Sequence, residues 1–87
     1  MTGWTWELSE RADRIRYSLA RVSGSLFWLE TEESRQLSFN AGVLANDVML
    51  PEYSNDEALD RAEEELKRYR AEYERLAQEK AASEDME

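Results

Sequence analysis

Two apolar stripes at helical spacing constrain the fold of this chain more than any other feature. Each stripe recurs at intervals of three and four residues, which is the period of one face of an α-helix. The first consists of Leu8, Ala12, Ile15, Leu19, Val22, Leu26 and Leu29. The second consists of Leu59, Ala62, Leu66, Tyr69, Tyr73 and Leu76. The two stripes predict two amphipathic helices that bury these side chains against one another.

The ends of these helices are indicated by residues that favour helix starts. The first helix is predicted to begin near Thr5 or Ser9. The last is predicted over 56–80, because Ser54 and Glu57 have capping-box spacing, with Asn55 as a competing N-cap. Residues 81–87, "AASEDME", lose the stripe, and we expect them to form a frayed acidic tail after a single helical domain over 1–80.

The segment between the stripes supports a second helix. Thr31 can cap it, since two acidic residues follow in the favourable first turn. Its apolar stripe consists of Leu37, Ala41, Leu44 and Val48. The fold predicted in this way is all-α, a small antiparallel three-helix bundle with a long C-terminal helix.

A β-hairpin is the alternative for the same region. Leu37, Phe39, Ala41 and Val43 also alternate with polar or small residues at the period of a strand. This pattern predicts an α+β fold with a hairpin at about 25–41 packed on helices. We favour three helices, because the first stripe continues unbroken as far as Leu29.

The composition argues against catalysis and against export. The chain of 87 residues has no histidine and no cysteine, so the usual general base, thiol nucleophile and metal ligands are missing. We therefore expect a protein that is not an enzyme, with no catalytic residue, cofactor or metal. The N-terminal "MTGWTWELSE" lacks a signal sequence, and no apolar run has the length of a membrane span, which predicts a cytoplasmic protein without a membrane partner.

The net charge of −9 is distributed unevenly and predicts a basic partner. Residues 1–30 are balanced, whereas 31–55 carry −3 and 56–87 carry −6. Four arginines give the first helix a basic side, and we expect them to pair with acids of the last helix instead of with nucleic acid: Arg11, Arg14, Arg16 and Arg21. A basic protein surface, including that of a nucleic-acid-binding protein, is thus the expected partner.

Several aromatic side chains lie off the apolar stripes. Phe27 and Trp28 project to other sides of the first helix, so they either cover one end of the bundle or form an exposed patch. Trp4 and Trp6 pose the same choice between capping the bundle and anchoring a partner. A second stripe on the middle helix lies roughly opposite its predicted core face and consists of Phe39, Val43 and Leu50.

Two functional hypotheses follow. The first is a small acidic interaction protein, an inhibitor or nucleic-acid mimic of the phage anti-defence (anti-CRISPR-like) or antitoxin class, to which the chain is similar in size and charge alone. Its predicted partner-binding residues are Phe27, Trp28, Glu32, Glu33, Glu63, Glu64 and Glu72. The alternative is a structural, self-associating helical protein, either a homodimeric bundle or an assembly subunit.

Overall fold

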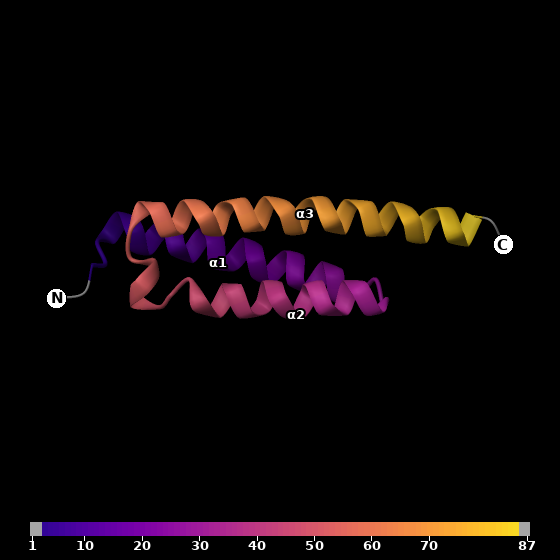
Figure 1. Ribbon diagram of the computed structural model, residues 1–87, viewed down its shortest axis with the longest axis horizontal. Helices are drawn as coiled ribbons and strands as arrows, with labels where there is room; N and C mark the ends of the chain where they lie inside the picture. Colours follow the sequence, from indigo (N-terminus) through magenta and orange to yellow (C-terminus); the bar gives the residue numbers. More distant parts are fainter. Residues whose placement is uncertain (1–2, 86–87) are drawn as a thin grey trace.

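The computed structural model describes residues 3–85 as three helices and one short 3₁₀ turn (Figure 1). Helix α1 spans Trp6–Phe27, α2 spans Glu32–Asp47, η1 spans Pro51–Tyr53 and α3 spans Asp56–Asp85. α1 and α3 run in one direction and α2 runs in the opposite direction. The all-α bundle with a long C-terminal helix is confirmed. The hairpin alternative is wrong, because residues 25–27 complete α1 and residues 32–41 belong to α2.

Side-chain caps fix the starts of α1 and α2. The Thr5 hydroxyl accepts a hydrogen bond from the Leu8 amide at 3.2 Å. The Thr31 hydroxyl accepts one from the Ser34 amide at 3.0 Å, while the Ser34 hydroxyl accepts one from the Thr31 amide at the same distance. Both predicted starts are therefore confirmed, and each cap satisfies amides that have no partner inside the helix.

The start of α3 corrects one prediction. The Asn55 side chain accepts a hydrogen bond from the Ala58 amide at 2.8 Å and is the N-cap. Ser54 is not the cap, because its hydroxyl donates to the Pro51 carbonyl of η1 at 2.5 Å. The turn before the helix thus uses the hydroxyl that a capping box would need.

The two stripes form the core. Their fully buried members include Ala12, Leu19, Leu26 and Leu59, to which Ala41 of α2 and its C-cap residue Val48 are added. Leu29 and Tyr73 are half-buried and pack against this cluster. The stripes predicted from the sequence are therefore the surfaces on which the three helices meet.

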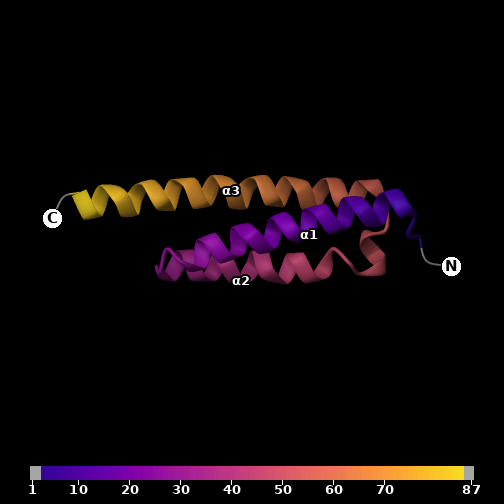
Figure 2. The same ribbon diagram turned by 180° about the vertical axis from the view of Figure 1, so that it is seen from behind.

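α1 lies against both other helices. Seen from behind in Figure 2, it runs obliquely across them, and its second half still adjoins α3, where Val22 and Tyr73 line one groove. Contacts of α1 with α2 are more extensive than those with α3, and α2 touches α3 least. α3 continues past the end of α1 as far as Asp85, beyond the predicted end at residue 80. Fraying of this last turn stays a prediction, and residues 86–87 lie outside the described part of the chain.

Candidate functional site

The first candidate surface is the connection between α1 and α2 together with the part of α3 beside it, here called the turn end (residues 27–33 and 72–84). Glu30 adopts a left-handed backbone conformation (φ 59°), which reverses the chain between the helices. The Leu29 carbonyl accepts a hydrogen bond from Lys80 Nζ at 3.1 Å. Leu29 and Leu76 also line a shallow cavity of about 440 Å³. The connection is thus attached to α3 at a defined place.

Phe27 and Trp28 are the exposed aromatic residues of the turn end. Their rings meet edge to face with centroids 6.1 Å apart, a favourable arrangement for an aromatic pair. Phe27 is 55% and Trp28 73% exposed. Neither ring covers the core, so of the two roles predicted for them, the exposed patch is the one observed.

Arg75 brings two of the predicted acidic residues together at the turn end. Its Nη2 atom lies 2.6 Å from Glu33 Oε2 and 2.5 Å from Glu72 Oε2, and its Nη1 atom lies 3.0 Å from Glu79 Oε1. The hydrogen bond to Glu72 and then that to Glu33 raise the pKa of Arg75 above its ordinary value. Three carboxylates against one guanidinium leave an excess of negative charge on this part of the turn end.

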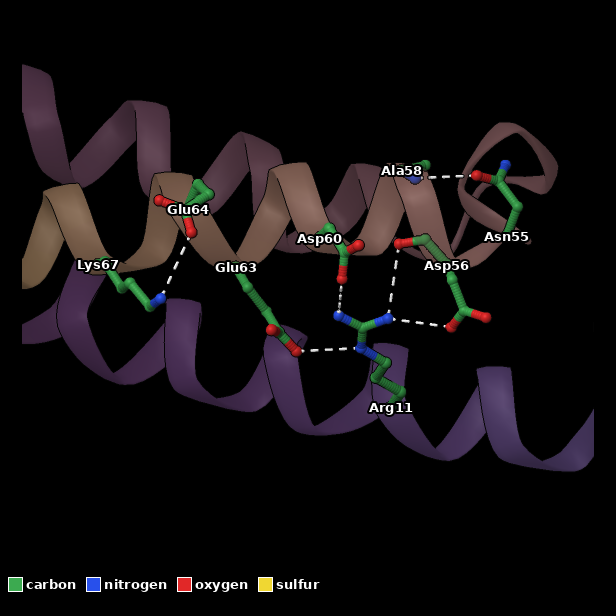
Figure 3. A network of polar contacts seen from close by, with 8 residues as sticks. All are labelled: Arg11, Asn55, Asp56, Ala58, Asp60, Glu63, Glu64 and Lys67. Atoms are coloured by element: carbon green, nitrogen blue, oxygen red, sulfur yellow. Dashed lines mark hydrogen bonds and ion pairs between the residues drawn. The ribbon is translucent and has the colours of Figure 1, made fainter.

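Glu32 adds to this surface, whereas Glu63 and Glu64 lie elsewhere. Glu32 is exposed, and within residues 3–85 it forms no ion pair. Glu63 accepts a hydrogen bond from Arg11 Nε at 3.0 Å, near the opposite end of the bundle, and Glu64 lies 3.3 Å from Lys67 Nζ (Figure 3). The structure therefore gathers Phe27, Trp28, Glu32, Glu33 and Glu72 at one end and separates the other two predicted residues from them.

Arg11 connects α1 to the start of α3. Its guanidinium contacts Asp56 at 3.0 Å and Asp60 at 2.5 Å, in addition to Glu63 (Figure 3). The hydrogen bonds to Glu63 and then to Asp60 raise the pKa of Arg11 above its ordinary value. The predicted pairing of α1 arginines with α3 is confirmed for this residue.

For the other α1 arginines, the predicted pairing with α3 is not observed in the part of the chain that the structure describes. Arg14 and Arg16 pair within α1, with Glu10 and Asp13. Arg21 lies over the Tyr17 ring at 5.9 Å from its centroid. Arg14 and Arg21 line grooves beside α3, yet residues four positions away within α1 provide their observed partners.

The second candidate surface is a groove of about 510 Å³ between α1 and α2, here called the α1–α2 groove. It is lined by Ser23, Phe27, Arg35, Ser38, Phe39, Gly42, Val43 and Asn46, with no residue of α3. Phe39 is 68% exposed and Val43 41%. No function was predicted for this surface from the sequence, although the stripe of Phe39, Val43 and Leu50 was the signal that could have found it.

Small side chains form the floor of the groove. The Ser23 hydroxyl donates to the Ser38 carbonyl at 2.7 Å, and the Ser38 hydroxyl donates to the Ser23 carbonyl at 2.7 Å. A methyl group placed on Gly42 would lie 3.5 Å from the Ser23 hydroxyl oxygen. The two helices approach closely here, and the larger side chains of Phe27 and Phe39 line the groove beside this contact.

The N-terminal tryptophans differ from each other. Trp4 is half-buried and packs against the core, so the predicted capping role is confirmed for it. Trp6 is 80% exposed at the first residue of α1, so a capping role is wrong for Trp6, as it is for Trp28.

The described residues contain neither a candidate metal-binding group nor a membrane-spanning helix. Within residues 3–85, acidic side chains nowhere gather in a group of three that could hold a metal ion. None of the helices in that range has an apolar stretch long enough to cross a bilayer.

Comparison with known proteins gives no match to a protein-family model, a curated sequence or a solved structure.

Proposed function

We propose that the protein is a non-enzymatic interaction module that binds a basic surface of a protein partner through the turn end. The observation that carries this proposal is Trp28, an aromatic side chain 73% exposed at the C-cap of α1, in the connection that leads into the acidic first turn of α2. Tryptophan is enriched at binding hot spots because its large ring loses much water-exposed area for little conformational entropy.

The charge around Trp28 favours a basic partner. Glu30 and Glu32 add to the carboxylates that share Arg75, and α3 has an excess of acidic over basic residues along its length. Such a field accelerates encounter with a positive surface, while the aromatic contact slows dissociation. An inhibitor or nucleic-acid mimic of the anti-defence or antitoxin class is the specific form of this proposal, supported by size and charge alone.

The test compares two exposed tryptophans at opposite ends of α1. The immobilised protein is used to recover partners at about 0.05 M and about 0.5 M salt, and each recovered protein is then purified and titrated. We expect a basic partner whose affinity falls with salt and falls at least about tenfold for Trp28→Ala. Trp6→Ala is the matched control and should leave the affinity unchanged.

Variants of the acidic residues form the second part of the experiment. Glu32→Gln combined with Glu33→Gln should mainly slow association, whereas Glu63→Gln combined with Glu64→Gln, away from the turn end, should have a smaller effect. A partner whose binding ignores salt and Trp28→Ala would contradict the proposal.

A further inference from the structure

We infer that the α1–α2 groove is the interface of a homodimer, in which α2 packs antiparallel against α2 of a second copy. This surface shares Phe27 with the turn end, but its lining contains neither Trp28 nor any acidic residue of the proposed function. Its occupant is identified by three observations: the absence of acidic residues from the groove lining, the placement of two charges on α2, and the self-complementary order of four residues along that helix.

The α1–α2 groove is the surface on which two copies of charge −9 can approach each other with least repulsion. The sequence contains 20 acidic residues, yet none occurs in 14–29 or in 34–46, the segments that supply the groove. α3, with its excess of acids, contributes nothing to the lining. Phe39 and Val43 supply exposed apolar area at its centre. A second copy can therefore bury this area without bringing carboxylates together.

Two charges on α2 are placed against the helix macrodipole. Arg35 is the fourth residue of α2, near the positive N-terminal end, and Asp47 is the last residue, at the negative C-terminal end. Within residues 3–85, neither side chain takes part in an ion pair. Both are thus unfavourably placed in the monomer.

An antiparallel second copy reverses both disadvantages. Arg35, Phe39, Val43 and Asp47 follow one another at four-residue intervals. A two-fold axis midway between Phe39 and Val43 places each of these two side chains against the other in the second copy. The same axis places Arg35 level with Asp47 of the second copy, next to the negative end of that helix. An unrelated antiparallel helix would match this pattern only if it also carried a cation near its start and an acidic residue near its end.

The size of the face predicts a moderate affinity. α2 has 16 residues and is therefore about 24 Å long. A face of that length and two helices wide gives about 1,000 Å² of total buried surface, near the lower limit for a specific interface. We expect a dissociation constant in the micromolar range, about 1–100 µM. The dimer would carry two turn ends, which adds avidity toward a partner with repeated basic sites.

The experiment is sedimentation equilibrium of the full chain from about 1 µM to about 500 µM, on either side of the expected dissociation constant. Arg35→Asp and Asp47→Arg should each weaken the dimer at least about tenfold, because each creates two like-charge contacts. The double variant, which exchanges the charges, should return to within about threefold of the original affinity. Both single changes improve the charge pattern of α2 toward its own dipole, so loss of the dimer would not reflect loss of the helix.

Two further variants separate this contact from overall charge. Arg61→Asp alters the net charge as Arg35→Asp does but lies on α3, and should change the dissociation constant less than about threefold. Asp47→Arg makes the protein less acidic, so general repulsion alone predicts a tighter dimer, opposite to the expected result. Phe39→Glu should abolish the dimer while circular dichroism shows an unchanged fold, since Phe39 is already exposed.

The outcomes are distinct. A protein that is monomeric at about 500 µM would overturn the proposal and leave the groove to a foreign helix. A dimer that survives Phe39→Glu would place the interface on another face. A double variant as weak as the single variants would exclude the antiparallel register. Trp28→Ala should leave the dimer intact, so failure here and failure of the proposed function are distinguishable.

Discussion

α1 contacts α3 and α2 in different ways. Against α3 it places aliphatic and tyrosine side chains of the two stripes, and Arg11 closes the edge of this contact with three carboxylates. Against α2 it places serine opposite serine, with alanines and Gly42 nearby, and the edge is an open groove. The contact with α3 is closed by a polar network at the start of α3, and smaller grooves lie further along it, whereas the edge of the contact with α2 leaves aromatic side chains in water.

The difference follows from side-chain size. Large side chains fill the space between two helices and need only a polar edge to complete the contact. Small side chains let the backbones approach, and the larger residues flanking them then project outward beyond the contact, as Phe27 and Phe39 do. Both contacts therefore stabilise the monomer, and the open edge of the contact with α2 in addition offers a surface to another molecule.

The largest expected effect is on the closed contact. Leu66→Asp places a carboxylate in the core, where Leu66 is 6% exposed. We expect a loss of at least about 3 kcal/mol in the free energy of unfolding, measured by urea denaturation.

Glu64→Gln is the matched control two residues away. Its side chain is exposed and forms an ion pair only with Lys67, so the change should lie within about 0.5 kcal/mol of the parent protein. Similar denaturation midpoints for the two variants would show that the α3 stripe is not the core.

The polar edge of the closed contact gives the next effect. Arg11→Met removes a cation from three carboxylates but keeps much of the aliphatic stem, and the Arg11 side chain is only 20% exposed. We expect a loss of about 1–2 kcal/mol in unfolding free energy, which shrinks as salt is added.

Arg14→Met serves as the control for Arg11→Met. Arg14 is 70% exposed and has one long contact of 3.9 Å to Glu10, so its replacement should not change the denaturation midpoint measurably. Equal losses for the two variants would mean that the contacts of Arg11 with α3 contribute nothing of their own.

The two contacts also differ in what the sequence could predict. The stripes and the Thr31 cap depend on local spacing, and both predictions are confirmed. The partners of Arg11 lie 45 to 52 residues away, and the rotation of α1 relative to α3 decides which arginine reaches them. Spacing within one helix contains no information on that rotation.

The candidate site was predictable in part for the same reason. Phe27 and Trp28 lie off the stripe, which predicted either a cover for the end of the bundle or an exposed patch, and the structure shows both side chains exposed. Glu63 is a predicted partner-binding residue because it lies off the α3 stripe. A residue off the stripe can still face a neighbouring helix at the edge of the contact, as Glu63 does toward Arg11. The α1–α2 groove requires two helices to be placed together, so its amino acids alone did not reveal it.

On the open contact, Ser38→Ala should cost about 1 kcal/mol of unfolding free energy. The substitution removes the hydroxyl that donates to the Ser23 carbonyl and leaves the partly buried Ser23 hydroxyl with its bond to the Ser38 carbonyl. Thermal and urea denaturation both measure this loss.

The double variant Ser23→Ala with Ser38→Ala tests whether the two serines act together. We expect it to cost less than the sum of the single losses, because the two hydroxyl oxygens lie 3.1 Å apart and each single change already removes this shared contact. Strict additivity would indicate two independent hydrogen bonds.

The smallest expected effects come from the two helical glycines, which also separate monomer stability from association. A methyl group added to Gly24 would have no neighbouring atom within 4 Å, and one added to Gly42 would lie 3.5 Å from the Ser23 hydroxyl, an ordinary contact. Gly24→Ala and Gly42→Ala should therefore each stabilise the monomer by about 0.5–1 kcal/mol through helix propensity.

Only Gly42 lines the α1–α2 groove, so only its methyl group would occupy space that a second copy needs. Thermal denaturation at low concentration should show similar gains for both variants, whereas sedimentation should show weaker association for Gly42→Ala alone. Equal association of the two variants would indicate that the floor of the groove is not part of the dimer contact, even if Phe39 is.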